Sequence, residues 1–397
     1  MEQKKKIALL IPALDDGGMG RVLETLSTGL SKTKYEQYII VLINDRSIRY
    51  KYDGELIAIT EEGKGVLGKA VAFFKRIFYV RRIKKKYQFD SVISFGGTAN
   101  AINALTRQNE KVIMTQHSVT SIENKQCGMY GIIADLFVRT YNMADTLVVV
   151  SKFIKTDLIR NYNIDSNIIK VIYNGIDVED VREKANMEVD TSFMKNKVNL
   201  ISVGRLAESK GLINILKIAP KLINKIPNVQ LIFIGDGEYR KCLEDKVRDL
   251  HLEKHVKFLG RKENPFPYVK AARVFLFPSR YEGFGMAFLE AMAIGVPVIA
   301  TDCKAGPREV LADNDDYDAC VKEKWMASYG VLVPQMEPLC DAKDDLSESE
   351  KEFLESIECL LFNSDLNDIY CLAGKNRSTD FSCSSMIRQY EQIIDAD

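Results

Sequence analysis

The sequence has few histidines, no excess of either charge and no cysteines arranged as metal ligands. Three of its 397 residues are His, and its eight Cys show neither C-x-x-C nor Cys/His spacing, which excludes the common zinc sites. The 55 basic and 55 acidic residues cancel, so no net field favours nucleic acid as a partner. No apolar run approaches the ~20 residues that a membrane-spanning helix requires.

Length and composition indicate a globular protein with two domains. A chain of 397 residues exceeds what one hydrophobic core usually serves. Its 46% hydrophobic and 28% charged residues are ordinary for a globular protein and unlike a disordered one. Because the cysteines are scattered and no signal-peptide pattern is present, we expect a reducing, cytoplasmic environment.

Short apolar runs alternate with helical patterns twice along the chain. The runs lie at 7–11, 38–43, 91–95, 111–115 and 146–150, then at 199–203, 230–234, 256–259, 274–277, 296–300 and 330–334. Helical patterns such as 21–30 and 132–142 separate several of them. This alternation predicts an α/β fold of parallel sheets with helices on both faces. The polar stretch 177–197 is the predicted linker between the domains.

The most informative stretch is RYEGFGMAFLEAMAIGVPVIATD, residues 280–302. A pattern typical of a buried strand precedes it, and a helix-forming run, 286–294, follows two glycines. The N–H groups and dipole of such a helix start favour an anion. Glu282 lies just before the helix, and Glu290 lies about two turns farther along the same face. Two carboxylates beside an anion pocket suit a nucleotide-sugar, although glutamates with this spacing can also be merely solvated.

The wider stretch FPSRYEGFGMAFLEAMAIGVPVIATD, residues 277–302, resembles the signature of the retaining glycosyltransferases of the GT-B fold, family 4, also called glycosyl transferases group 1. The resemblance is strongest over 198–311. It implies two Rossmann-like domains that face each other across a cleft. We expect an acceptor-side domain at 1–176, a nucleotide-sugar-binding domain at 177–378 and a final helix, 379–397, that returns to the first domain.

The segment ISVGRLAESKG, residues 201–211, places Arg205 and Lys210 around a turn. Two basic residues in a turn are usually only solvated, but this spacing resembles the family's, which uses both side chains on the donor diphosphate. Fixed cations and a helix start can neutralise a departing diphosphate. Because no D-x-D-like site is evident, we expect transfer that requires neither a metal nor a cofactor.

The resemblance assigns the other donor contacts as well. Glu282 would hold hydroxyls of the donor sugar, Glu290 those of the ribose, and Arg261 lies where the base usually rests. The expected substrate-binding set is therefore Gly18, Arg205, Lys210, Arg261, Glu282, Phe284, Gly285, Met286 and Glu290. The expected catalytic set is His117, Arg205, Lys210 and Glu282.

The first half of the chain contains two of these candidates. The loop 15–21, DDGGMGR, competes as a dinucleotide-binding turn, helped by Asp45, but G-G-x-G is not G-x-G-x-x-G. In the resembled family this loop reaches the donor phosphate and sugar, with Gly18 the expected backbone contact. His117 follows an expected strand. A single His there is most often structural, but the family places a His beside the sugar. His117 would hold the sugar through a hydrogen bond or its backbone carbonyl.

A basic segment, 65–87, reads GVLGKAVAFFKRIFYVRRIKKKY and contains eight Lys or Arg and no acid. Apolar and basic residues alternate in it at helical intervals, which is typical of a helix that lies on an anionic bilayer. The alternative is a helix packed on the core with a charged outer face. The local excess of positive charge in a chain of zero net charge favours an anionic membrane surface.

These observations predict a glycosyltransferase, either a hexosyl- or an N-acetylhexosaminyltransferase. It would move a sugar, with retention, from a nucleoside-diphosphate sugar, most simply UDP-linked, to a lipid-linked or membrane-proximal glycan in surface polysaccharide or glycoconjugate assembly. We expect it on the inner face of the cytoplasmic membrane, with no nucleic acid as a partner. The alternatives are a UDP-sugar epimerase of the same fold and a non-catalytic nucleotide-sugar-binding protein.

Overall fold

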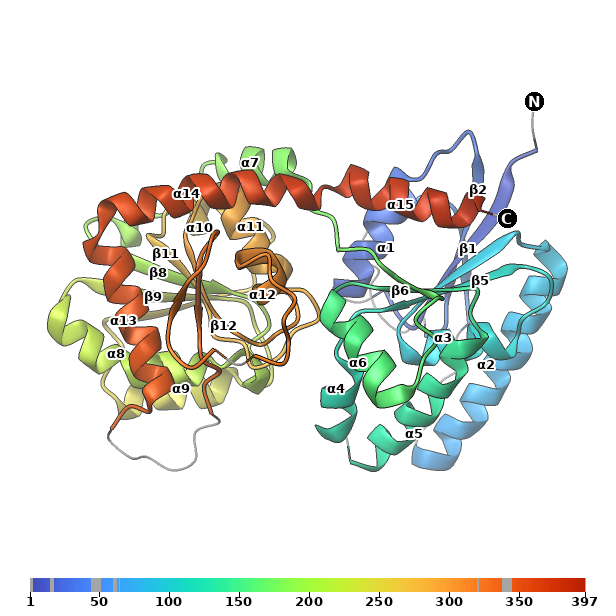
Figure 1. The fold of residues 1–397 in the computed structure, drawn as a ribbon, viewed down its shortest axis with the longest axis horizontal. Coiled ribbons are helices and arrows are strands. Elements are labelled where there is room, and N and C mark those ends of the chain that lie inside the picture. Colours follow the sequence, from blue (N-terminus) through green and yellow to red (C-terminus); the bar gives the residue numbers. More distant parts are fainter. Residues whose placement is uncertain are drawn as a thin grey trace. The chain divides into compact units, whose positions relative to one another are not determined.

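The computed structural model describes residues 3–14, 18–43, 51–59, 63, 65–126, 128–319, 321–337 and 345–396. The chain forms two compact units, one of residues 1–175 with 383–397 and the other of residues 176–382. Each unit contains one seven-stranded sheet with helices on both of its faces (Figure 1). The predicted α/β architecture is therefore confirmed.

The first unit has an all-parallel sheet of order β3-β2-β1-β4-β5-β6-β7. Its strands are β1 (Lys5–Ile11), β2 (Tyr35–Val41), β3 (Glu55–Ala58), β4 (Ser91–Phe95), β5 (Lys111–Gln116), β6 (Thr146–Val149) and β7 (Ile169–Val171). Its helices are α1 (Gly18–Gly29), α2 (Gly65–Tyr87), α3 (Gly97–Leu105), α4 (Thr120–Gln126), α5 (Met129–Val138), α6 (Lys152–Tyr162) and α15 (Cys383–Asp395), with a 3-10 helix at Arg139–Met143.

Strand β1 shows why this sheet is covered on both faces. Ile7, Leu9 and Ile11 pack into one core cluster, which also receives Met386 and Tyr390 of α15. The intervening Ala8 and Leu10 pack into a second cluster with Val80 of α2. Successive side chains of a strand point to opposite faces, so a continuous apolar run is what a strand buried on both sides requires.

The second unit has the sheet order β10-β9-β8-β11-β12-β14-β13, parallel except for the last pair. Its strands are β8 (Val198–Val203), β9 (Val229–Ile234), β10 (Val256–Gly260), β11 (Val274–Phe277), β12 (Val298–Thr301), β13 (Trp325–Met326) and β14 (Val331–Val333). Its helices are α7 (Val178–Ala185), α8 (Leu212–Lys225), α9 (Arg240–Asp249), α10 (Phe266–Lys270), α11 (Met286–Ile294), α12 (Pro307–Leu311), α13 (Glu348–Phe362) and α14 (Ser364–Ser378), with 3-10 helices at Ser192–Met194, Glu208–Lys210 and Thr379–Phe381.

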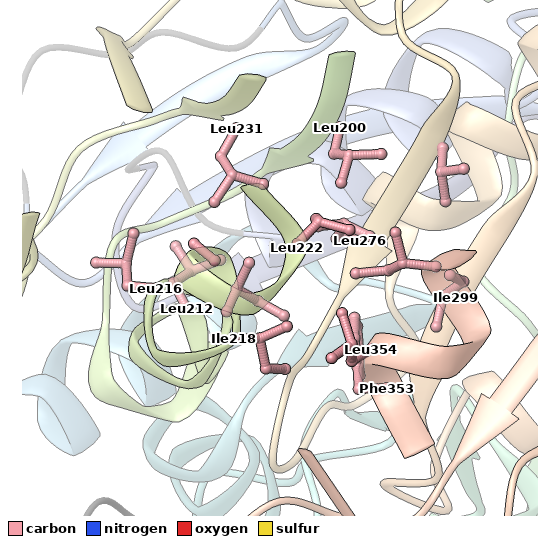
Figure 2. Close-up of a cluster of buried hydrophobic side chains, with 14 of the residues drawn as sticks. Leu200, Leu212, Leu216, Ile218, Leu222, Leu231, Leu276, Ile299, Phe353 and Leu354 are labelled. Atoms are coloured by element: carbon pink, nitrogen blue, oxygen red, sulfur yellow. The ribbon is translucent and has the colours of Figure 1, made fainter. Parts of the chain in front are cut away.

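The core of the second unit forms between its sheet and helices α8 and α13. Leu212, Leu216 and Leu222 project from one face of α8 toward the sheet residues Leu200 and Leu231 (Figure 2). All five are at most 4% exposed. Their i, i+4 and i+10 spacing places them on one stripe of a helix, so this stripe packs α8 against the sheet.

The predicted linker at 177–197 is wrong. Residues 176–382 form one unit, and α7 begins at an N-cap in which Asp177 Oδ1 accepts a hydrogen bond from the Asp180 N–H at 3.0 Å. Val181 and Ala185 of this helix are buried. A short amphipathic helix with only two buried residues resembles a polar linker in composition, which explains the error. The chain instead passes between the units at 175/176 and again at 382/383.

Helix α2, which spans the basic segment, is packed on the core along one side and exposes aromatic and basic side chains along the other. Val80 is fully buried in the core of the first unit, whereas Phe74 and Phe78 are 69% and 63% exposed. Lys84 was expected on the outer face but is 2% exposed, and its ammonium donates to Glu110 Oε1 at 2.7 Å and to Asn103. Burial lowers the pKa of Lys84 to about 8, although Glu110 opposes this shift. Lys84 therefore fixes α2 in the unit and does not contribute to its surface charge.

Candidate functional site

The turns after β8, β9 and β11 lie in close contact at the carboxyl edge of the second sheet. Gly211, with φ +63°, lies so near the turn after β11 that a Cβ there would be 2.1 Å from the Pro278 carbonyl oxygen. A Cβ at Gly235 would be 1.8 Å from the Gly204 carbonyl oxygen. Only glycine permits such approaches. The carboxyl edge of a parallel sheet is where α/β proteins bind ligands.

Lys210 and Glu282 meet in this group of turns. The Lys210 ammonium donates to Glu282 Oε1, and the Ser279 hydroxyl donates to the same oxygen at 2.8 Å. The two ionic side chains are only 26% and 11% exposed. Among the described residues, Glu282 Oε2 accepts no hydrogen bond. The resemblance assigns Lys210 to the diphosphate and Glu282 to the sugar, but the structure joins the two side chains in one partly buried ion pair.

Arg205 lies beside this pair. A small pocket is lined by Arg205, Lys210, Ser202 and Ser279 together with apolar residues that include Phe277. Arg205 itself is exposed to solvent, so its guanidinium is available to a ligand at the pocket mouth. The structure therefore brings together both predicted phosphate-binding cations.

Helix α11 begins at this edge. Its N-cap residue, Gly285, has φ 95° and ψ 62°, and a Cβ there would lie 2.3 Å from the ring of the buried Phe288. Phe284 is buried at 3% exposure, and Met286 is the first helical residue. The first N–H groups of an α-helix have no partner within the helix, so Gly285 and Met286 present donors where the sequence predicted an anion.

Glu290 lies farther along α11 and is 8% exposed. Glu282, with 11% of its side chain exposed, is also largely withdrawn from water. The interpretation that both glutamates are merely solvated is therefore wrong. Carboxylates are rarely withdrawn from water without bonded partners, and Glu282 has Lys210 and Ser279 as its partners. The roles of both glutamates toward a donor stay predictions.

Arg261 follows β10 at the same carboxyl edge and is exposed. Gly260, the last residue of β10, has φ +64°, a left-handed conformation that turns the chain at this point. The position of Arg261 is compatible with the contact to the base that the resemblance implies, and this role stays a prediction.

The loop after β12 contains a buried ion pair that the sequence analysis missed. Arg308 of α12 donates through Nε to Asp302 Oδ1 at 2.8 Å and through Nη2 to Oδ2, and the two residues are 1% and 6% exposed. Arg308 also donates to the Asp316 carbonyl oxygen. A Cβ at Gly306 would lie 1.8 Å from the Phe284 carbonyl oxygen, so this loop supports the start of α11. The only signal was an Asp and an Arg six residues apart.

Two predicted site residues belong to the first unit, and Gly18 is one of them. Gly18 is exposed at the start of α1, and a Cβ built on it would meet nothing within 4 Å. Packing within the unit therefore does not require glycine here. Asp15, Asp16 and Gly17, as well as Asp45 of the competing dinucleotide interpretation, lie outside the described residues.

The second predicted site residue of the first unit is His117, which directly follows β5. Its Nε2 lies 2.8 Å from Thr115 Oγ1, and that hydroxyl donates its own proton to the Ser94 carbonyl oxygen. Nε2 must then carry the imidazole proton, which leaves Nδ1 as an acceptor. Nδ1 is buried and has no partner among the described residues. Burial lowers the pKa of His117 to about 4, so the ring is neutral at pH 7 and suited to accept a hydrogen bond from a hydroxyl group.

The described residues contain neither a membrane-spanning helix nor a cluster of metal ligands. None of the helices there has the length and apolarity to cross a bilayer. No group of three or more His, Cys, Asp or Glu residues in the same part of the chain is arranged to hold a metal ion.

Two family models match the chain, one to each half. The model described as Glycosyltransferase Family 4 matches residues 16–180, and the model described as Glycosyl transferases group 1 matches residues 183–329. The second match contains Arg205, Lys210 and both glutamates of α11 and its preceding turn.

Similar proteins share about a quarter of their residues with this chain. One is a Campylobacter jejuni GalNAc-alpha-(1->4)-GalNAc-alpha-(1->3)-diNAcBac-PP-undecaprenol alpha-1,4-N-acetyl-D-galactosaminyltransferase, 26% identical over 98% of both chains. Another is the amylovoran biosynthesis glycosyltransferase AmsD of Erwinia amylovora, 27% identical over 78% of this chain and 84% of its own.

Solved structures share the fold at lower identity. HepE of Anabaena in complex with UDP superposes with a TM-score of 0.73 at 19% identity, covering 98% of this chain and 99% of its own. WaaG, a glycosyltransferase involved in lipopolysaccharide biosynthesis, superposes with a TM-score of 0.74 at 16% identity, covering 98% and 100%. With two parallel-sheet units of this topology and family matches to both halves, the chain belongs to the glycosyltransferases of the GT-B fold.

Proposed function

We propose that the protein transfers a sugar, with retention of configuration, from a UDP-sugar to a lipid-linked or membrane-proximal glycan in the assembly of a surface polysaccharide or glycoconjugate. The observation that carries the proposal is the partly buried group of Lys210, Glu282 and Ser279 beside Arg205 at the start of α11. This group offers two cations and helix N–H donors to a diphosphate and a carboxylate to a sugar.

The ion pair defines how a donor would enter. A diphosphate that approaches the start of α11 would compete with Glu282 for the Lys210 ammonium, because phosphate oxygens accept from Lys and Arg as strongly as carboxylates do. Glu282 would then turn its oxygens to sugar hydroxyls, while the Ser279 hydroxyl, 2.8 Å from Oε1, limits how far the carboxylate can rotate. Donor binding and placement of the sugar are in this way coupled.

Retention would follow from attack on the face that the diphosphate leaves. The acceptor hydroxyl oxygen forms the new bond to the anomeric carbon as the bond from that carbon to the phosphate oxygen breaks, and the departing phosphate takes the hydroxyl proton. Arg205, Lys210 and the start of α11 would stabilise the negative charge that grows on the diphosphate. His117 would accept a hydrogen bond from a sugar hydroxyl at Nδ1, and Gly18 would contribute a backbone contact to the donor.

The similar proteins support the donor and the acceptor. HepE is crystallised with UDP, with UDP and glucose and with UDP-glucose. The Campylobacter jejuni relative is named for an undecaprenol-linked acceptor, and AmsD for the biosynthesis of amylovoran. By analogy we infer a UDP-linked donor and a glycan acceptor on a lipid carrier.

A lipid-linked acceptor implies that the protein works at an anionic membrane surface on the cytoplasmic side. Helix α2 supports this part of the proposal, because Arg81, Arg82, Lys85 and Lys86 are exposed on it and the helix contains no acid. Exposed basic residues near an anionic bilayer each contribute roughly 1 kcal/mol to binding.

The test is hydrolysis of the donor in the absence of an acceptor. The full chain is incubated with UDP-, GDP- and ADP-sugars, and NMR follows the first sugar released. We expect slow release from a UDP-sugar, with an α-linked donor giving the α-anomer first, and a much lower rate in Glu282→Gln. Release of the inverted anomer would contradict retention, preference for another base would contradict UDP, and an epimerised UDP-sugar would establish the alternative activity.

A further inference from the structure

Helix α5 presents aliphatic side chains to solvent. Ile132, Ile133 and Leu136 are 72%, 42% and 59% exposed. Their spacing of three and four residues places them next to one another on the helix surface. Single exposed apolar residues are normal in globular proteins, but a cluster of them on one helix marks an interaction surface.

The exposed face of α5 carries no charge. The helix, MYGIIADLFV, contains one residue that is charged at neutral pH, Asp135. The Asp135 carboxylate accepts hydrogen bonds from Asn124 Nδ2 at 2.7 Å and from the Tyr162 hydroxyl at 2.6 Å, so it faces α4 and α6. This arrangement satisfies the acid inside the unit, and the large exposed side chains described on α5 are the aliphatic ones of Ile132, Ile133 and Leu136.

Helix α2 continues this apolar surface. Val71, Phe74 and Phe78, spaced at helical intervals, are 56%, 69% and 63% exposed. The two helices lie side by side (Figure 1). The ring of Phe73 on α2 stacks on that of Phe137 on α5, with centroids 5.0 Å apart. We define the α2–α5 surface as the exposed side chains Val71, Phe74, Phe78, Ile132, Ile133 and Leu136.

Basic residues border the α2–α5 surface. Arg81, Arg82 and Lys85 follow Phe78 on the outer side of α2 and are exposed. Within the described part of the chain, none of the three forms an ion pair with a carboxylate. An exposed apolar cluster with unpaired cations beside it has the chemistry of the interface of an anionic bilayer, which offers acyl chains next to phosphate groups.

We propose that the α2–α5 surface inserts into the headgroup region of an anionic bilayer, with α5 supplying the main inserted residues. This inference deepens the proposed function, on whose membrane-linked acceptor it rests, and it assigns insertion to α5 as well as to the basic helix α2. A second copy of the chain is a poorer occupant. A two-fold interface on this surface brings its own basic residues together, whereas a bilayer supplies the opposite charge.

The first experiment measures binding of the full chain to vesicles of phosphatidylcholine and phosphatidylglycerol. Ile132→Ser/Ile133→Ser/Leu136→Ser should weaken binding roughly 10- to 100-fold at both about 50 mM and about 500 mM salt, because loss of apolar burial is not screened. Arg81→Gln/Arg82→Gln/Lys85→Gln should weaken binding mainly at the lower salt concentration.

The matched control lies in the second unit. Ile369 and Leu372 of α14 are 60% and 63% exposed, and Ile369→Ser/Leu372→Ser should leave vesicle binding unchanged. Equal losses in the α5 and α14 variants, or a parent that does not bind these vesicles at low salt, would overturn the proposal. So would a parent that forms dimers which the α5 variant abolishes while vesicle binding persists.

A second measurement tests the depth of insertion. The chain has a single Trp, Trp325 in the second unit, so Trp325→Phe/Leu136→Trp places one fluorophore on α5. We expect its emission to shift to the blue on vesicles and to be quenched by lipids brominated on their acyl chains; unchanged emission would contradict insertion of α5. UDP-sugar hydrolysis in solution should stay at the parent's rate in the α5 serine variant. Loss of vesicle binding with normal hydrolysis in the α5 variant would therefore report on the α2–α5 surface alone. A parent that hydrolyses no donor would contradict the proposed function alone.

Discussion

The two units share a strand order but arrange the carboxyl edges of their sheets differently. The first five positions run third, second, first, fourth and fifth strand in both. In the second unit, charged side chains at this edge are already paired, as in Lys210–Glu282 and Asp302–Arg308. In the first unit, the corresponding edge carries a neutral His117 whose Nδ1 has no partner among the described residues. The same scaffold thus holds a preorganised ionic site in one unit and a buried acceptor atom without a described partner in the other.

This comparison indicates in which unit substitutions should slow catalysis most. Groups that act on charge developing in a transition state have the largest kinetic effects. A neutral hydrogen bond contributes roughly 0.5–1.5 kcal/mol. Substitutions in the second unit should therefore slow turnover far more than those in the first.

The largest effect is expected at the two cations. Arg205→Ala and Lys210→Ala should each lower kcat by about 10²- to 10³-fold, or roughly 2.7–4 kcal/mol, because both act on the departing diphosphate. Folding should be unaffected, as measured by urea unfolding. Lys221→Ala, an exposed lysine on α8 of the same unit, is the matched control and should retain full activity. Near-parental turnover in both site variants would remove these residues from the mechanism.

Alanine substitution of a glycine should destabilise the protein more in the second unit than in the first. Gly285→Ala should lower the free energy of unfolding by about 1–3 kcal/mol, because φ is 95° and the new Cβ would lie 2.3 Å from the Phe288 ring. Gly18→Ala should change it by about 1 kcal/mol or less, since that Cβ has open space. Equal effects of the two substitutions would show that the strain at the start of α11 is absent.

His117 should give a smaller, pH-dependent effect. Its folded pKa of about 4 lies below the ~6.5 of an unfolded histidine, so the unfolded chain binds more protons between these values. The contribution of His117 to stability is then complete above pH 6.5 and is lost as the pH falls toward 4, by at most about 3 kcal/mol. Unfolding of the parent and of His117→Gln at pH 7 and pH 4.5 measures the difference. An NMR titration midpoint near 6.5 would contradict the burial of a neutral ring.

No effect is expected from removal of divalent metal. The proposed stabilisation of the leaving group uses Arg205, Lys210 and the start of α11, so EDTA should leave the rate within about twofold of the untreated enzyme. An enzyme that EDTA silences and Mg²⁺ or Mn²⁺ restores would show that these cations do not suffice.

Much of the fold could be predicted from the sequence because its central strands are strongly patterned. The expected runs 91–95 and 274–277 coincide with β4 and β11, and the helix at 286–294 coincides with α11. Strands β3, β7 and β13 were not predicted because they lie at the edges of the sheets and are mostly exposed or half-buried, so they lack the continuous apolar run of a strand that is buried on both faces. β12 begins at Val298, not at 296, because Pro297 has no N–H to donate to a ladder.

The site was predicted less completely, because sequence order does not show pairing. Glycines at close approaches and a run such as EGFG are local signals, so the start of α11 could be located. The Lys210–Glu282 pair joins residues 72 positions apart, and burial of Lys84 depends on Glu110 and Asn103 of other elements. Each of these contacts is set by which strands are neighbours, which no single motif encodes.

The central claim is that the nucleotide-sugar binds to the preorganised edge of the second unit. Hydrogen–deuterium exchange of the full chain, with and without saturating UDP, tests it most directly. We predict that protection is greatest in residues 203–211 and 282–290, where the phosphate cations, the start of α11 and both glutamates lie. Protection confined to the first unit around Gly18, as a dinucleotide-binding turn there requires, or no protection in the second unit, would contradict the account.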